Sequence, residues 1–146
     1  MTTLPKDFKE FIELLNKNTV RYIIIGGYAV VYHGYVRSTN DIDIWIDIHS
    51  DNIKKVLKTL DEFGFSSLNI KKDDFSANQV IQLGFPPNRI DLITTPAGID
   101  FESCYESREQ VIIDKITLNI IDLESLIKSK QASGRTRDLA GVEELT

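Results

Sequence analysis

The chain has 146 residues, of which 42% are hydrophobic and 27% are charged, and its formal net charge is −5 at pH 7. This length and composition predict one folded domain over residues 1–146, without low-complexity segments. The acidic balance argues against a duplex-binding protein, and the lone Cys104 excludes an internal disulfide and a cysteine-based zinc site. We find no secretory leader and no apolar run of about 20 residues, so we expect a cytoplasmic protein without a membrane span.

The first half of the chain shows two helix patterns and two strand patterns. Apolar residues recur with helical spacing over 5–17 and over 51–63. Between them, residues 22–25 form a continuous β-rich run that is typical of a central strand, and 28–33 has room for one or two helical turns. Residues 41–48 alternate strictly, with isoleucine at every second position, and therefore give the clearest strand pattern in the chain.

The second half is expected to complete a mixed sheet. We interpret residues 65–75 as a short strand followed by an acidic turn. The remaining predicted elements are a hairpin of strands 79–83 and 89–94, a strand pair at 111–113 and 116–121, a helix over 123–133 with Asp122 as its N-cap, and a last helix from about residue 136. This order predicts an α+β (α/β) fold, with a mixed sheet of about five strands covered by helices.

Three aspartates are candidates for metal binding. Asp41 and Asp43 lie two residues apart, so both side chains point to the same face of their strand, with Cα atoms about 6.5–7 Å apart. A hard cation such as Mg²⁺ needs only one or two such carboxylates besides waters and phosphates. Asp91 interrupts the apolar run 89–93 and must either face solvent or have a partner that offsets its desolvation. Taken singly, each aspartate is better explained as part of the solvated side of a strand.

A glycine pair marks the end of the predicted central strand. Gly26 and Gly27 allow backbone N–H groups to approach an anion such as phosphate closely, although a plain strand-to-helix turn has the same composition. The G-x-G-x-x-G spacing and the G-x-x-x-x-G-K-[ST] loop are both absent from the chain. A dinucleotide-binding fingerprint and a P-loop NTPase are therefore excluded.

The spacing of these motifs resembles a known superfamily. Gly26-Gly27, followed after thirteen residues by Asp41-Ile42-Asp43, resembles the signature of the DNA polymerase β-like nucleotidyltransferases. The other matching segments are Tyr22–Val30, His33-Gly34, Arg37–Asp43, Arg89–Ile93 and Gly134–Leu139. Within the superfamily, the chain is similar to the minimal bacterial and archaeal nucleotidyltransferases of the abortive-infection and toxin–antitoxin type.

The resemblance implies an activity and roles for the aspartates and glycines. The expected reaction is transfer of a nucleoside monophosphate from an NTP, with ATP the expected donor, to a hydroxyl acceptor with release of pyrophosphate. Asp41 and Asp43 would hold the metals, two Mg²⁺ or Mn²⁺ ions. Asp91 would complete the triad and act as or assist the base, while Gly26 and Gly27 would hold the triphosphate.

Basic residues near the predicted helix 123–133 are weaker candidates. Lys128, Lys130, Arg135 and Arg137 would suit a triphosphate, and would equally complement the dipole of a helix end. Of the basic residues we assign Lys128 and Arg37 to nucleotide binding. His33, Tyr28 and Trp45 are interpreted as structural.

The sequence leaves the acceptor and the partner open. A protein, a tRNA or a small molecule would each offer a hydroxyl, and a toxin or antitoxin protein is a possible partner. The alternative to an enzyme is a non-catalytic antitoxin-like or regulatory module that keeps the nucleotidyltransferase fold. A third reading is an RNA-modifying toxin that acts on tRNA ends.

Overall fold

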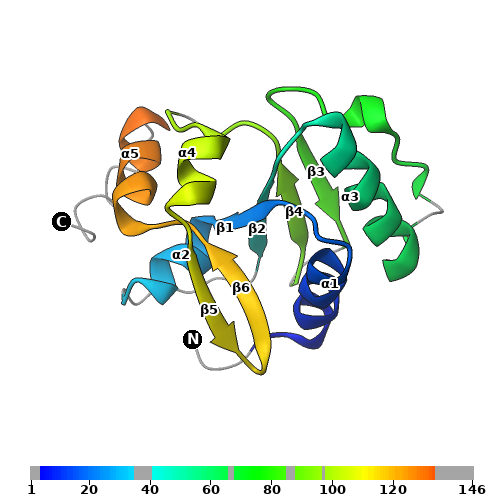
Figure 1. The fold of residues 1–146 in the computed structure, drawn as a ribbon, viewed down its shortest axis with the longest axis horizontal. Coiled ribbons are helices and arrows are strands. Elements are labelled where there is room, and N and C mark those ends of the chain that lie inside the picture. The colour runs from blue at the N-terminus through cyan, green and yellow to red at the C-terminus, as the bar shows by residue number, and fades with distance from the viewer. Residues whose placement is uncertain (1–3, 35–40, 66–67, 85–87, 97, 134–146) are drawn as a thin grey trace.

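The computed structural model describes residues 4–34, 41–65, 68–84, 88–96 and 98–133. Helices and strands alternate along the first half of the chain, and hairpins follow (Figure 1). In chain order the elements are α1 (Lys6–Lys17), β1 (Tyr22–Ile25), α2 (Gly26–Tyr32), β2 (Ile42–Ile46), α3 (Ser50–Phe63), the 3₁₀ helix η2 (Lys72–Asp74), β3 (Val80–Leu83), β4 (Ile90–Ile93), α4 (Phe101–Glu106), β5 (Glu109–Ile113), β6 (Ile116–Ile120) and α5 (Leu123–Ser133).

The strands form one mixed sheet in the order β3-β4-β2-β1-β6-β5. β2 is antiparallel to β1 and parallel to β4, while β1 is parallel to β6; β3–β4 and β5–β6 are antiparallel hairpins. The α+β prediction with a mixed sheet is confirmed. Among the described residues the sheet has six strands where about five were expected, and β5, which extends back to Glu109, lies at one edge of it.

The two faces of β2 have different environments. Ile44 lies on the same face as Tyr22, whose hydroxyl donates to Asn16 of α1 at 2.9 Å, and α1 and α3 lie side by side over this face (Figure 1). Side chains at odd-numbered positions of β2 point to the opposite face, where Trp45 packs edge-on against Phe101 of α4 at 5.1 Å. The alternation predicted for residues 41–48 therefore separates a buried core from a face that carries aspartates.

The helix boundaries follow from local sequence signals. α3 ends at Gly64, which adopts a left-handed φ of 101° that costs glycine little. Asp122 accepts a hydrogen bond from the Ser125 backbone N–H at 3.1 Å, which confirms it as the N-terminal cap of α5. The helix expected from about residue 136 lies outside the described residues.

The strand expected within residues 65–75 is wrong. In the described part of this segment the chain turns through η2, where the Asp74 carboxylate accepts from the Lys71 backbone N–H at 2.8 Å. Asn69 has a φ of 54°, which an extended strand does not allow. Phe65 and Ile70 suggested β structure by propensity, but they instead pack against the core from an irregular segment.

The helix α4 was not predicted from the sequence. Its start is fixed by Asp100, whose carboxylate accepts from the Ser103 backbone N–H at 3.1 Å. At six residues it is too short to show a clear helical repeat.

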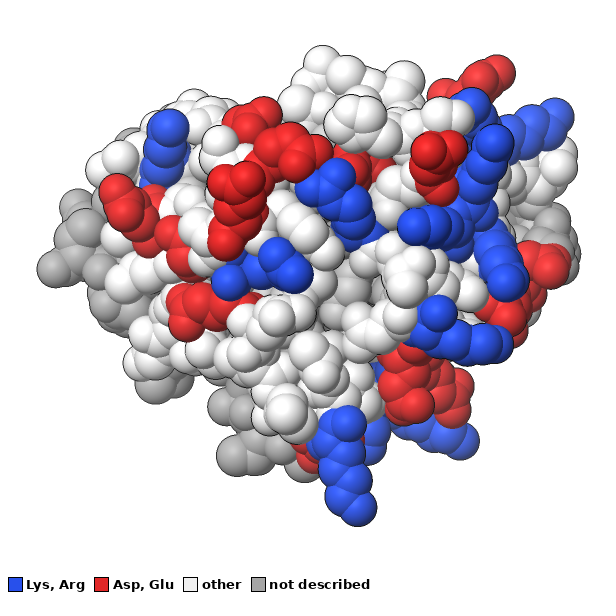
Figure 2. All heavy atoms as spheres, viewed as in Figure 1, with Lys and Arg blue, Asp and Glu red and all other residues white. Residues whose placement is uncertain are grey.

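Charged side chains of both signs are interspersed on the face drawn in Figure 2, with basic side chains gathered over α3. The lysines that α3 exposes are Lys54, Lys55 and Lys58. Within the described residues, no helix has the length and apolar character that crossing a membrane requires.

Candidate functional site

Two of the candidate carboxylates lie side by side on neighbouring parallel strands. Asp43 of β2 is directly in register with Asp91 of β4, so both side chains leave the same face of the sheet on strands about 4.8 Å apart. Asp41 comes immediately before β2, and its carboxylate accepts from the Arg89 backbone N–H at 3.1 Å. The fold thus brings together three carboxylates that are up to 50 residues apart in the sequence.

The glycine turn lies directly against this group. Ile25, the last residue of β1, is in register with Asp43, so the chain enters α2 beside that carboxylate. Gly26 has a φ of 71°, and a Cβ atom at this position would overlap Asp43 Oδ2 and lie 2.9 Å from Asp43 Cγ. Glycine is therefore required at position 26 both by the backbone conformation and by the close approach of Asp43.

Asp43 lies in surroundings that disfavour its charged form. Its pKa is raised to about 6, mainly because burial disfavours the ionised carboxylate, and the charges of Asp91 and Asp41 raise it further. Arg89 and Lys130 act in the opposite direction without restoring the ordinary value. Three carboxylates gathered at one end of β2 fit a hard divalent cation such as Mg²⁺ or Mn²⁺, which prefers oxygen ligands.

Arg89 contacts two of these carboxylates directly. Its Nε donates to Asp91 Oδ1 at 2.8 Å and a terminal nitrogen donates to Asp91 Oδ2 at 3.1 Å. The same terminal nitrogen lies 3.2 Å from Asp41 Oδ2. The pKa of Arg89 is raised, first by its hydrogen bond with Asp91, and Asp91 itself is 7% exposed. Arg89 lies in the segment Arg89–Ile93 that matches the superfamily, but its motif alone predicts no role for it.

Two lysines of α5 differ in where they lie. Lys130 is only 8% exposed, although it is a lysine, and its charge acts on Asp43. Lys128, the residue assigned from the sequence to nucleotide binding, is exposed, and its charge acts on Cys104. A signal for Lys130 was present, because it follows the buried Leu126 by four residues and so falls on the helix stripe that faces inward.

The remaining residues singled out in the sequence lie at separate places in the fold. Gly27 lies in the first turn of α2, and Arg37 lies outside the described residues. His33 Nε2 is 2.8 Å from the Ile121 carbonyl oxygen, which confirms a structural role. Trp45 Nε1 donates to the Thr94 carbonyl at 3.2 Å from a buried position, which is likewise structural.

A second group of possible metal ligands lies beyond the other end of β2. The ligand atoms of Asp47, His49 and Glu102 all lie within 4.8 Å of one another. Arg21 already pairs with Asp47 at 3.0 Å and with Glu102 at 2.7 Å. A guanidinium thus occupies the space in which a cation would lie, and we call this group the Arg21 cluster.

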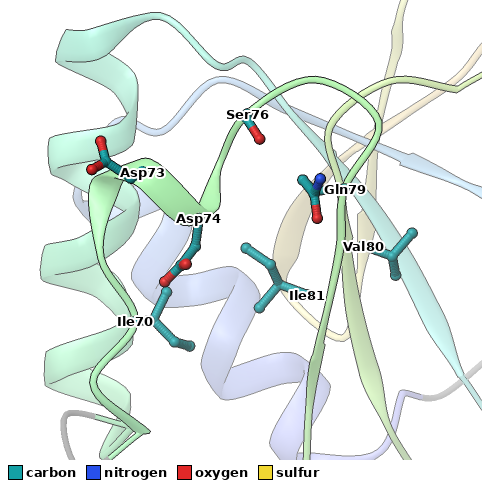
Figure 3. Close-up of a pocket in the computed structure, with 7 residues that line it drawn as sticks. All are labelled: Ile70, Asp73, Asp74, Ser76, Gln79, Val80 and Ile81. Atoms are coloured by element: carbon teal, nitrogen blue, oxygen red, sulfur yellow. The ribbon is translucent and has the colours of Figure 1, made fainter.

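A hollow of about 430 Å³ is present at the β3 edge of the sheet. Figure 3 shows Asp74, Ile70 and Ile81 around this space. Ile81 is in register with Leu92, the neighbour of Asp91, and therefore points to the opposite face of the sheet from Asp91. The hollow is accordingly separate from the group of carboxylates.

Comparisons with solved structures place the fold among nucleotidyltransferases. The chain is similar to the lincosamide antibiotic adenylyltransferase LnuA in its lincomycin-bound crystal structure, with a TM-score of 0.58 and 17% identity over 99% of this chain and 98% of that one. It is also similar to an antigenic nucleotidyltransferase-like protein from Paracoccidioides brasiliensis, with a TM-score of 0.56 and 18% identity over 94% of this chain and 73% of that one. No curated protein matches the sequence.

A family model agrees with the fold and with the superfamily resemblance. The model described as "Nucleotidyltransferase of unknown function (DUF6036)" matches residues 3–146, which is nearly the whole chain. The chain therefore belongs to this family of nucleotidyltransferases.

Proposed function

We propose that the chain is a metal-dependent enzyme that transfers a nucleoside monophosphate from an NTP to a hydroxyl and releases pyrophosphate. One observation carries the proposal: Asp43 and Asp91 are in register on parallel neighbouring strands, on the face that the Gly26 turn approaches. Paired carboxylates beside a turn without side chains provide for both a cation and the phosphates that accompany it.

Asp41, Asp43 and Asp91 would hold the divalent cations, with Mg²⁺ or Mn²⁺ and two ions as the superfamily implies. Bound cations would supply charge neutralisation for the phosphates and for the developing negative charge. The fit rests on the all-oxygen donor set and on the absence of a Cβ at Gly26, and the pKa of Asp43, which burial and the neighbouring aspartates raise, agrees with it.

The bonds that form and break in nucleotidyl transfer determine the roles of the other residues near the site. The acceptor oxygen attacks the α-phosphorus, the bond from that phosphorus to the bridging oxygen breaks, and pyrophosphate leaves with the electron pair. Asp91 would accept the proton of the acceptor hydroxyl. Lys130, buried and acting on Asp43, would lie near the phosphates, whereas the roles of Gly27, Lys128 and Arg37 in nucleotide binding stay predictions.

A small molecule is the first acceptor to test. LnuA is named as an adenylyltransferase of a lincosamide antibiotic, and it shares the fold over nearly the full length of both chains. We therefore propose ATP as the donor and a hydroxylated small molecule as the acceptor. Protein and tRNA acceptors serve as the comparison arms of the same experiment.

The test follows the label from ATP. The protein is incubated with α-labelled ATP and Mg²⁺ or Mn²⁺, and separately with lincomycin, a tRNA mixture and a cell lysate, while pyrophosphate release is recorded. Asp43→Asn and Asp91→Asn should each lower transfer by about 100-fold or more, because each removes charge that the transition state needs. Asp47→Asn, which changes the same residue type at the other end of β2, should leave transfer intact.

Binding measurements distinguish the hypothesis of an enzyme from that of a non-catalytic module. Calorimetry with ATP in the presence and absence of Mg²⁺ should show metal-dependent binding in the wild type and none in Asp43→Asn. Metal-dependent ATP binding without transfer to any acceptor would favour the regulatory module. The absence of both binding and transfer would refute the assignment of the site.

A further inference from the structure

Arg89 contacts every carboxylate oxygen of two of the three candidate ligands. Both Asp91 oxygens accept from its side chain, at 2.8 and 3.1 Å. One Asp41 oxygen accepts from its backbone N–H at 3.1 Å, and the other lies 3.2 Å from the terminal guanidinium nitrogen. The atoms that would bind a cation are thus already engaged by one arginine.

We propose that Arg89 is a built-in counter-ion that a divalent cation displaces from Asp91 and Asp41, and that its released guanidinium then binds the triphosphate. This inference rests on the function proposed above. A guanidinium has only donors and always carries its charge, so it cannot share these oxygens with a metal without repulsion. The same planar fork matches phosphate oxygens as well as it matches a carboxylate.

The side chain of Arg89 is able to move while its backbone stays in place. Its carbonyl accepts from the Ile42 N–H at 3.0 Å and its N–H donates to Asp41, so the main chain is fixed against the start of β2. The side chain is 27% exposed, which leaves it a route towards solvent. Displacement therefore needs a change of side-chain rotamer and no rearrangement of the sheet.

The proposed reaction also requires that Asp91 be released from Arg89. Asp91 accepts two hydrogen bonds from Arg89, one on each carboxylate oxygen, so both oxygens face the guanidinium. A carboxylate engaged in this way is poorly placed to ligate a metal or to take a proton from a hydroxyl. Binding of the cation would thus prepare Asp91 and free the phosphate-binding side chain in one step.

The Arg21 cluster provides a matched control. Arg21 also bridges two carboxylates, but Asp47 is buried and the guanidinium lies 4.6 Å from the Tyr105 ring and 5.5 Å from the Phe101 ring. Replacing Arg21 by glutamine removes the same unit of charge from the protein without touching Asp41, Asp43 or Asp91.

The experiment titrates Mn²⁺ alone into the full chain and counts free ions by electron paramagnetic resonance. Arg89→Gln should bind Mn²⁺ about three- to fivefold more tightly than the wild type, because the cation no longer competes with a resident charge. In a second titration, with Mg²⁺ present in excess, the same variant should bind a non-hydrolysable ATP analogue about tenfold more weakly, since a charged contact to phosphate is lost. Arg21→Gln should leave the affinity for the ATP analogue unchanged, and any additional Mn²⁺ that it binds at Asp47, His49 and Glu102 should persist when Asp43→Asn is added.

Opposite signs in the two titrations are the signature of a displaced counter-ion. If Arg89 merely orients the ligands, its removal weakens metal binding, by about 10- to 100-fold for a typical orienting partner, and the inference is overturned. If thermal unfolding shows that Arg89→Gln does not fold, Arg89→Lys replaces it. An ammonium cannot bridge both carboxylates, so the Mn²⁺ affinity of Arg89→Lys should again exceed that of the wild type. A lower affinity overturns the inference. If neither the wild type nor any Arg89 variant binds Mn²⁺, the proposed function fails together with the inference.

Discussion

The two ends of β2 carry the same kinds of charged side chain in different surroundings. At the start of the strand, Arg89 meets Asp41 and Asp91, with Asp43 beside them at a pKa of about 6. At the other end, Arg21 meets Asp47 and Glu102 in the Arg21 cluster. In the first group, Arg89 and Lys130 lower the pKa of Asp43 without restoring its ordinary value, whereas the second group also holds His49, which lies 2.6 Å from Asp47.

This difference indicates how a functional group of charges is distinguished from a structural one. In the Arg21 cluster the guanidinium is further held by Phe101 and Tyr105, so the charges are satisfied within the protein. Around Asp43, burial and the neighbouring aspartates disfavour the charged carboxylate, which costs stability and favours a cation from solution. Short distances between ligand atoms, as in the Arg21 cluster, are therefore not enough to identify a functional group, whereas the raised pKa of Asp43 indicates the group at the start of β2.

The largest effect is expected from closing the space at Gly26. Gly26→Ala places a methyl group onto Asp43 and forces alanine into a left-handed conformation. We expect transfer activity to fall by about 100-fold or more, because the carboxylate must shift, and stability to fall by about 1–3 kcal/mol. Gly64→Ala is the control: φ is 101°, but no atom lies within 4 Å of the new Cβ, so only the backbone cost of about 1 kcal/mol should appear. Equal activity losses in the two variants would contradict the role of the close approach.

The next effect concerns stability alone. Asp47 is 3% exposed and accepts from Arg21 and from the His49 backbone N–H, so Asp47→Asn should lower the free energy of unfolding by about 2 kcal/mol. Glu102→Gln, at an exposed position, should cost less than about 1 kcal/mol. Urea denaturation measures both values. Loss of nucleotidyl transfer in folded Asp47→Asn would place the functional site at the wrong end of β2.

Local pattern was enough to predict much of this molecule. Strict alternation over residues 41–48 gave the strand that separates Asp43 from the core, and capping chemistry gave the start of α5 at Asp122. Alternation also places Arg89 and Asp91 on one side of their strand, so their contact was accessible from the sequence. An arginine two residues from an aspartate on one strand face is a signal for such an ion pair.

Long-range register was not accessible in the same way. That Asp43 lies opposite Asp91 depends on the parallel pairing of β2 with β4, which α3 and β3 separate in the chain. Nothing local fixes such a pairing. The superfamily resemblance supplied Asp91 instead. Charge alone does not distinguish Lys128 from Lys130, whereas the helical phase of α5 places Lys130 inward and Lys128 at the surface.

A smaller effect should appear in the pH dependence of the metal-free protein. The pKa of Asp43 is raised from 3.8 to about 6, so between these values the folded chain holds a proton that the unfolded chain releases. Stability should therefore fall as pH rises through this window. A shift of about two units corresponds to about 3 kcal/mol, which partial exposure reduces to about 1–2 kcal/mol. Asp43→Asn should be more stable than the wild type at pH 7 by that amount, measured by urea denaturation in EDTA. A less stable variant would contradict the raised pKa of Asp43, because it would show that the ionised carboxylate does not destabilise the fold.

The smallest effect belongs to the Arg21 cluster. The pKa of His49 is raised, first by its hydrogen bond with Asp47, so its stabilising contribution is complete below the ordinary value of 6.5 and is lost as pH rises through the folded value. His49→Gln should remove only this dependence, in a window above that of Asp43. An NMR titration of the imidazole should show the pKa returning to its ordinary value in Asp47→Asn. Because these charges are balanced within the protein, His49→Gln should leave the pH profile of nucleotidyl transfer unchanged, whereas a shifted profile would show that the two ends of β2 are coupled.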